Sequence, residues 1–447
     1  MTYTYPIIEM TIAGEEIIWQ DADIVTASVI QEIHPIGLEM PISVVNFTIY
    51  TTDARFSIFD DGELYSALSA GQVIQVFESV DGIPVFINEF YLQEWKYVAT
   101  NTIQFKGVDL IGMLDGMPFD GGFWDSLTDI ETILAAILDT HGISCVVSSA
   151  LASVTLKGWI PPGTVREAIQ QVCYAARAVV GSIIGGVLVF DTAVYPLAST
   201  SVDLEIPDTD KQDNQTVELK PLVTGVVLMS HNYSQGATSE VIFSETLEPG
   251  SYKVVFNKPY YSITATGVGY IPDYLITEGD DFLVTEGGDY LVGNGDYEYG
   301  PNSILLTVFD PGGAVEITGY PWIDSKQELL NAITPGNRSN DLVIENATLV
   351  NKTNQYAVIY RTTDYYQRRY DHRFTLLSYN APTALYGLAP VYGTGVYSAA
   401  GLKVGDTVRS NMLHKAVLGV AEKLDYDLTG GFRINVRSVG LQSAPIA

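Results

Sequence analysis

The feature of this sequence that most restricts its fold is a series of short apolar or alternating segments in residues 5–110. Turn-forming stretches rich in Gly, Asp and Pro separate them. Alternation with a period of two places the apolar side chains on one face of a strand. Strands at this spacing predict a β-barrel or a β-sandwich. The predicted strands are Ile7–Ile12, Glu16–Trp19, Ile24–Gln31, Ser43–Tyr50, Val73–Glu78, Ile83–Leu92 and Thr102–Val108.

Residues 158–190 depart from this pattern and predict a helix followed by two strands. Thr164 and Glu167 form a capping box, in which the hydroxyl and the carboxylate can satisfy N–H groups of the first helical turn. Residues 179–190 are β-branched and interrupted by glycines, as in a strand, a turn and a second strand. The apolar residues of the helix recur as one buried stripe, namely Val165, Ala168, Ile169, Val172, Cys173 and Ala176.

A second capping box, Thr128 with Glu131, predicts another amphipathic helix. Gly142 stands where a left-handed residue is expected after its end. Together with the first helix and its strand pair, this predicts a small α/β domain. From about residue 200 the chain again reads as strands, and Thr353 is the expected cap of a last helix over 354–369.

An acidic octapeptide repeat occupies residues 273–298, which hold eight carboxylates and no Lys or Arg. Each unit is an aromatic residue and two aliphatic ones followed by a turn, which predicts a β-hairpin arm. The carboxylates are open to two interpretations. They bind Ca²⁺, or they form a solvated acidic hairpin whose charges prevent edge-to-edge association.

Composition limits the kinds of partner. Charged residues make up only 17% of the chain, and the mean hydropathy is +0.16. No apolar run reaches the ~18 residues of a membrane helix. The apolar excess indicates either a large subunit interface or a large internal core. The net charge of −30 argues against a nucleic-acid-binding protein, because such binding depends on basic surface.

Nothing in the sequence points to catalysis, a cofactor or a bound metal. The five histidines stand at none of the spacings that bind zinc, and no nucleophile elbow, phosphate-binding loop or dinucleotide motif occurs. Scattered Asp and Glu could pair as in a glycosidase, but any acidic chain permits that. We therefore expect no enzyme and assign no catalytic, cofactor-binding or metal-binding residue. Cys145 and Cys173 are expected to be buried thiols rather than a disulfide, as suits a reducing cytoplasm.

One basic, aromatic-rich run, residues 360–373, contrasts with the acidic chain. One interpretation is a contact for a partner, either a protein or passing nucleic acid. The other is the end of a helix, where the arginines oppose the negative end of the helix dipole and the tyrosines pack. Between the two partners, a protein suits the net charge better than DNA. The candidate contact residues are Arg361, Tyr365, Tyr366, Arg368, Arg369 and Arg373.

Several separated pieces of the chain, taken in order, resemble bacteriophage tail hub proteins, the trimeric β-rich proteins of the tail tip or baseplate. Together they reach over most of the chain, and their shared order carries the resemblance. The pieces are Asp109–Asp115, Phe119–Gly122, Gly158–Ala178, Leu247–Tyr252, Asn346–Val350, Tyr365–Tyr370, Gly405–Val408 and Asp427–Phe432.

The resemblance implies a mainly β fold with an α/β insert: two barrel-like β domains, a small α/β domain and an added β-hairpin arm. The expected domains are a first β-barrel hub domain at 1–110, an α/β connector at 111–192, a β domain with the acidic arm at 193–340, and a helix with second-barrel strands at 341–447. Because the family has no enzymatic motif, no catalytic residue carries over.

The resemblance also implies a structural role in a homotrimer. Its six barrels would form a pseudo-sixfold ring that joins the tail tube to the tip and encloses the channel for DNA passage, without specific DNA binding. The implied partners are a tail tube or distal tail protein, a tape-measure protein, and a spike or fibre protein. The implied location is the virion tail tip, after assembly in the host cytoplasm.

Two other functions stay open. A receptor- or glycan-binding tail-tip protein is favoured by the content of 28 Tyr. A peptidoglycan hydrolase is opposed by the missing motifs.

Overall fold

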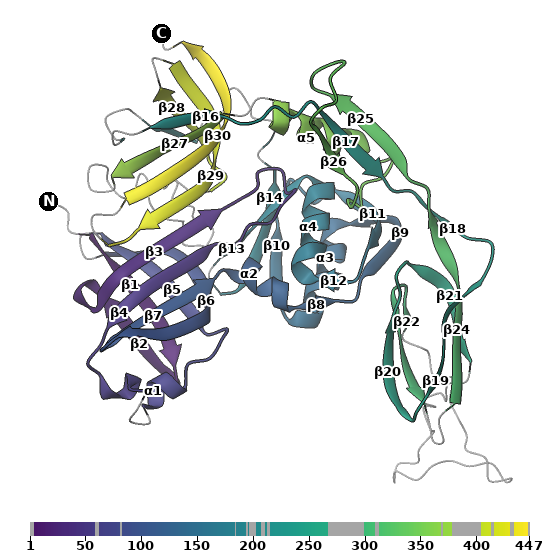
Figure 1. Ribbon diagram of the computed structural model, residues 1–447, viewed down its shortest axis with the longest axis horizontal. Helices are drawn as coiled ribbons and strands as arrows, with labels where there is room; N and C mark the ends of the chain where they lie inside the picture. Colours follow the sequence, from purple (N-terminus) through teal and green to yellow (C-terminus); the bar gives the residue numbers. More distant parts are fainter. Residues whose placement is uncertain are drawn as a thin grey trace.

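The fold is mainly β, as the sequence predicts, with a smaller α/β region (Figure 1). A large sheet that contains both ends of the chain lies on one side, the α/β region lies in the middle, and further β-strands extend from it on the other side. The acidic repeat, and with it the question of calcium, lies outside the described residues. The computed structural model describes residues 4–58, 62–80, 83–183, 185–193, 195, 203–206, 211, 215–266, 299–308, 313–367, 370–377, 404–412, 415–429 and 433–445.

All seven strands predicted in residues 5–110 form, and they pair antiparallel in the order β3-β4-β7-β6-β5-β1-β2. Their core is aromatic: the rings of Phe47 and Phe105 stack at 4.9 Å, and Trp19 lies 5.6 Å from Phe105. The elements are β1 (Thr4–Ile12), β2 (Glu15–Gln20), a 3-10 turn (Asp21–Asp23), β3 (Ile24–Glu32), β4 (Val44–Tyr50), a 3-10 turn (Ala54–Phe56), α1 (Glu63–Ser66), β5 (Val73–Val80), β6 (Ile83–Ala99) and β7 (Thr102–Val108).

Strands from the end of the chain continue the same sheet. Strand β29 pairs antiparallel with β3, with Lys423 opposite Glu32 and Asp427 opposite Ser28, so that the two strand sets form one 13-stranded sheet. The pairing among the described strands does not close into a barrel. The C-terminal set consists of β15 (Leu204–Ile206), β16 (Thr216–Leu219), β27 (Tyr370–Leu377), β28 (Thr407–Met412), β29 (Lys415–Asp427) and β30 (Arg433–Pro445).

The predicted α/β region forms around two helices, α3 (Ile130–Leu138) and α4 (Val165–Ala176), packed on a three-stranded sheet. The capping box of Thr164 and Glu167 is confirmed. The predicted cap of α3 is wrong by one residue, because the Asp129 carboxylate accepts the Thr132 N–H. The other elements are α2 (Leu110–Met113), 3-10 turns Leu114–Gly116 and Asp139–His141, β8 (Pro118–Phe119), β9 (Gly122–Asp129), β10 (Ser144–Val147), β11 (Thr155–Ile160), β12 (Gly163–Thr164), β13 (Ala178–Ile183) and β14 (Val187–Thr192).

The third region combines small sheets with helix α5 (Gln355–Gln367), which packs on β17. The predicted cap of this helix is wrong, because the Thr353 hydroxyl donates to Asn351 Oδ1. The predicted strand over 342–349 ends at Ile344. The strands are β17 (Gly225–Ser230), β18 (Tyr233–Gln235), β19 (Glu240–Leu247), β20 (Gly250–Val255), β21 (Tyr260–Thr266), β22 (Tyr299–Gly300), β23 (Ser303–Val308), β24 (Gly313–Asp324), β25 (Gln327–Ala332) and β26 (Asp341–Ile344).

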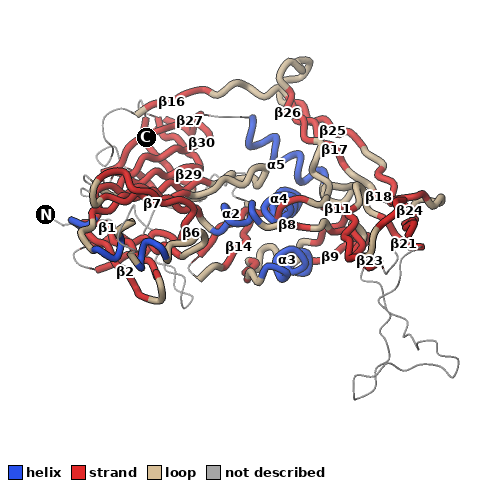
Figure 2. Tube along the Cα trace, turned by 60° about the horizontal axis from the view of Figure 1, so that its bottom comes forward, coloured by secondary structure: helices blue, strands red, loops and turns tan. Residues whose placement is uncertain are grey.

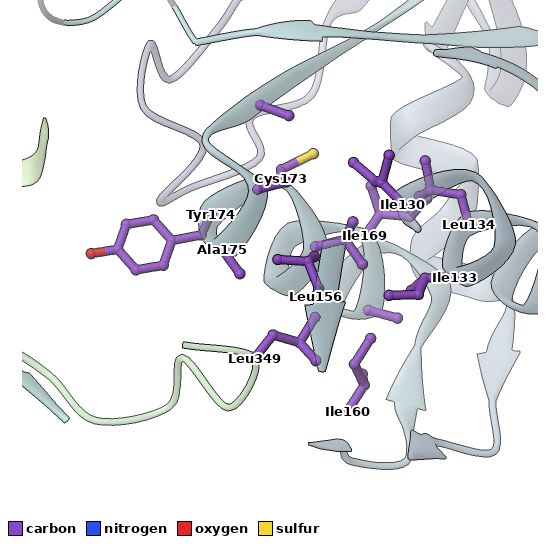
Figure 3. Packing of buried hydrophobic residues seen from close by; sticks show 14 of the residues in the cluster. Ile130, Ile133, Leu134, Leu156, Ile160, Ile169, Cys173, Tyr174, Ala175 and Leu349 are labelled. Atoms are coloured by element: carbon purple, nitrogen blue, oxygen red, sulfur yellow. The ribbon is translucent and has the colours of Figure 1, made fainter. Parts of the chain in front are cut away.

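Helix α4 lies between the other parts, as the tube in Figure 2 shows. On one side Arg166 and Gln170 donate to the carbonyls of Met40 and Leu38, in the loop between β3 and β4. On another side Gln171 Oε1 accepts the N–H of Thr348, 3.1 Å away. The apolar stripe meets α3 and Leu349, while Tyr174 extends away from the other labelled residues (Figure 3). The predicted stripe is therefore the centre of one core shared by residues far apart in sequence.

The turn between β13 and β14 also holds the α/β region against the large sheet. The buried Glu89 carboxylate, on β6, accepts the N–H groups of Gly185 and Gly186 at 3.2 and 3.1 Å. Both glycines have positive φ, at 84° and 69°, a conformation that costs other residues free energy.

We predict that Glu78 makes the stability of the fold depend on pH. Its side chain is buried on β5, neither carboxylate oxygen has a hydrogen-bond partner, and burial raises its pKa from 4.5 to about 8. Between these values the folded chain holds a proton that the unfolded chain releases. The free energy of unfolding should therefore fall as pH rises through this window, by up to about 1.4 kcal/mol per pH unit.

Urea unfolding at pH 5, 6.5 and 8 measures this slope. Glu78→Gln should flatten the slope and raise stability at pH 8, whereas the exposed Glu94→Gln should leave the slope unchanged. An equal slope in the parent chain and in Glu78→Gln would contradict the prediction.

Candidate partner-binding site

The basic, aromatic-rich run forms the second half of α5 and the start of β27. Arg361 lies inside the subunit, with 4% of its surface exposed. Its Nη2 donates to the carbonyl of Tyr174 at 2.8 Å, and its guanidinium lies 5.7 Å from the centre of that ring. Burial lowers the pKa of Arg361 to about 10, so the side chain is still a cation at neutral pH. Arg361 therefore attaches α5 to the end of α4.

Tyr365, one turn further along α5, is also buried. Its hydroxyl donates to Glu422 Oε1, 2.7 Å away on β29. Its ring lies 5.1 Å from His34 and 4.8 Å from Tyr366. Tyr365 therefore attaches α5 to the large sheet.

Arg373, on β27, has a side chain that is 59% exposed and forms an ion pair of 3.1 Å with the buried Asp371. Asp371 also meets Arg437 at 3.2 Å and Lys220 at 3.8 Å. Burial by itself would raise the pKa of Asp371, but the Arg373 hydrogen bond and the positive charges of Arg437, Arg373 and Lys220 together lower it. Asp371 is thus an anion held by three cations, which come from the end of β16, from β27 and from β30.

These pairs continue across the junction of the two strand sets. Arg437 lies 3.9 Å from Glu32 and 4.0 Å from Glu422, and Lys423 lies 3.1 Å from Glu32. We call the set of Glu32, Lys220, Asp371, Arg373, Glu422, Lys423 and Arg437 the junction network. Most of its members were missed from the sequence, although Asp371 and Arg373 stand two apart and therefore share one face of a strand.

The structure divides the predicted contact residues. Arg361 and Tyr365 are buried by contacts within the subunit, and a partner contact at either residue stays a prediction. Tyr366 is half-buried and Arg373 is exposed, and for these two a partner contact stays a prediction. Arg368 and Arg369 lie outside the described residues.

His141, His231 and His372 each have a ring nitrogen within hydrogen-bond distance of an oxygen. His231 is buried, with Nδ1 2.7 Å from Asp324 Oδ2 and Nε2 2.8 Å from the carbonyl of Glu345, so both ring nitrogens are occupied. In the described part of the chain no group of three His, Cys, Asp or Glu side chains is arranged to hold a metal ion, and no helix is long and apolar enough to cross a membrane. Both cysteines are free thiols.

No family model and no curated protein sequence matches the chain. Solved structures do resemble it along nearly its whole length. The 43 kDa tail protein of prophage MuSo2 from Shewanella oneidensis is 11% identical, with a TM-score of 0.48 and 98% of each chain covered. The tail protein from Neisseria meningitidis MC58 is 11% identical, with a TM-score of 0.49, covering 97% of this chain and 96% of that one.

A third similar structure is the prophage tail protein gp18 from Listeria monocytogenes EGD-e. It is 12% identical, with a TM-score of 0.46, and covers 97% of this chain and 94% of that one. All three of these similar structures are tail proteins, two of them from prophages.

We predict that the Tyr365 hydroxyl stabilises the subunit. Tyr365→Phe removes a buried hydrogen bond to a carboxylate and leaves Glu422 with one partner fewer, which should lower the free energy of unfolding by about 1–3 kcal/mol. Tyr360→Phe is the matched control, because Tyr360 lies on the same helix and is 61% exposed. Equal unfolding midpoints in urea for the two variants would refute this assignment.

Proposed function

We propose that the chain is the structural hub subunit of a phage-like tail tip or baseplate. It forms a homotrimer whose pseudo-sixfold ring joins the tail tube to the tip and encloses the channel for DNA. The observation that carries the proposal is the pairing of β3 with β29. It sets an N-terminal and a C-terminal strand set side by side in each subunit, so that three subunits present six such sets to a sixfold tube.

The junction network supports a rigid role for this pairing. In a chain with 23 basic residues against 53 acidic ones, both Lys423 and Arg437 of the C-terminal set pair with the half-buried Glu32 of β3, and Arg437 also pairs with the buried Asp371. Ion pairs that bridge separate strands fix how the two sets are placed relative to each other. A ring subunit needs that placement, because an error in it is repeated in every copy.

The partners that suit this role are a tail tube or distal tail protein, a tape-measure protein, and a spike or fibre protein. Tyr366 and Arg373 are the surface residues of the basic run proposed to meet one of them. DNA passes through without specific binding, which the net charge of −30 favours because phosphates are repelled. The chain is assembled in the host cytoplasm and ends in the virion tail tip.

The outer face of the sheet β25-β17-β26 supports association between copies. Leu330 and Val343, which are 45% and 53% exposed, lie in register on either side of Val227, which is itself 4% exposed. The opposite face carries the fully buried Val226 and Leu228. Exposed aliphatic side chains such as Leu330 and Val343 form a surface that a second protein surface covers favourably.

We predict that the purified chain sediments as a trimer and that Leu330→Glu with Val343→Glu weakens the trimer at least tenfold, because carboxylates would be buried in the interface. Leu127→Glu, at a 54% exposed site on β9, is the matched control. Unfolding curves of all variants should show that they fold. A strict monomer that is also absent from virions would refute the hub.

A glycan-binding tail-tip protein is the second candidate. The observation that favours it is the pair Tyr356 and Tyr360, 57% and 61% exposed on α5, whose rings stack at 6.4 Å. Aromatic faces of this kind are suited to sugar rings. Retention of labelled host polysaccharide that Tyr356→Ala with Tyr360→Ala abolishes would favour this candidate, and clearing of peptidoglycan gels would favour a hydrolase over both.

A further inference from the structure

A cavity of about 460 Å³ opens where α5 passes the end of α4 and the end of β14. Small apolar side chains form much of its wall. Its titratable and charged lining groups are Arg361, Arg177, Asp364, Tyr360 and Tyr195. With two cations and one carboxylate, the wall has a net positive charge inside a chain whose net charge is −30.

The guanidinium of Arg361 is incompletely used within the subunit. Its Nη2 is bonded to Tyr174, while its Nε and Nη1 are buried and have no hydrogen-bond partner. A buried cation without an opposite charge costs several kcal/mol, and donors without acceptors add to that cost. Nε and Nη1 carry three N–H groups and are closed to solvent, so a ligand oxygen in the cavity would relieve this cost after the Arg361 side chain turns toward it.

A carboxylate is the ligand chemistry that fits best. Two carboxylate oxygens match the planar fork of an Arg side chain, and such charge-assisted hydrogen bonds are about twice as strong as neutral ones. Arg177 adds a second cation at the cavity. It occupies the left-handed position after α4, with φ 60°, and its side chain is exposed. The apolar wall suits a peptide segment better than a small hydrated anion.

We propose that this cavity binds a carboxylate from a second copy of the chain, supplied by the acidic segment 273–298. The proposal rests on the homotrimer proposed above. The segment is the densest source of carboxylates in the chain, with eight of them and no Lys or Arg. The strands that flank it, β21 and β22, lie at the end of the molecule away from the large sheet, whereas α4 and α5 lie nearer its middle (Figure 1). We therefore assign the segment to the cavity of a neighbouring copy rather than to that of its own chain.

A labelled synthetic peptide of residues 273–298 tests the proposal when it is titrated into a full chain and followed by fluorescence anisotropy. In this full chain the eight carboxylates of the same segment are replaced by amides (Asp→Asn, Glu→Gln), so that the cavities are empty, and this chain is the parent for the variants below. It should bind saturably, and a peptide with all eight carboxylates replaced by their amides should not. Arg361→Met should weaken binding at least tenfold. Because a buried substitution can disturb folding, Arg177→Asn is the second variant, since Asn tolerates the left-handed conformation. It should weaken binding about threefold or more.

Lys352→Gln is the matched control, because it removes an exposed cation that does not line the cavity and should leave binding unchanged. Equal binding of the peptide by the parent chain and by both arginine variants would overturn the proposal, as would equal binding of the amide peptide. Sedimentation distinguishes failure of the carboxylate site from failure of the homotrimer. A trimer that does not bind the peptide refutes the carboxylate site alone, whereas a strict monomer refutes the trimer on which that site depends.

Discussion

The packing of α4 is the constraint on which the rest of the structure depends. The helix is amphipathic in sequence, yet in the fold nearly every one of its sides is used. Its apolar stripe joins α3 and the chain around Leu349, its Arg166 and Gln170 hold the loop after β3, and Tyr174 in its last turn accepts a hydrogen bond from Arg361. Gly37 shows how close the approach is, because a Cβ there would lie 2.5 Å from the Ala178 carbonyl. Residues that approach this closely transmit any shift to their neighbours.

Charge is used sparingly and in specific places. In this acidic chain three described arginines lie where separate elements meet: Arg166 at the loop after β3, Arg361 between α4 and α5, and Arg437 at the junction network. Buried ion pairs contribute little net stability, but breaking one is costly, and so they favour one arrangement of the elements over others. A mainly apolar interior supplies the stability, and these few cations determine which surfaces meet.

Local features were predictable from the sequence because they depend on neighbours in the chain. The seven N-terminal strands, the buried stripe of α4 and its capping box all follow from periodicity and from residues three apart. The pairing of β3 with β29 was not predictable, because Glu32 and Lys423 stand 391 residues apart and neither strand carries a pattern that specifies its partner. The burial of Arg361 was missed for a related reason: its contacts come from α4, about 187 residues earlier.

The position of β29 also governs when the large sheet can be completed. Strand β3 has β4 on one side and β29 on the other, so during synthesis its second edge stays open until residues 415–427 have left the ribosome. An open edge beside an aromatic core is a template for pairing with other nascent chains. Nearly four hundred residues must therefore be made while this edge is exposed. The yield of correctly folded subunits in the cell then depends on how that edge is shielded during translation.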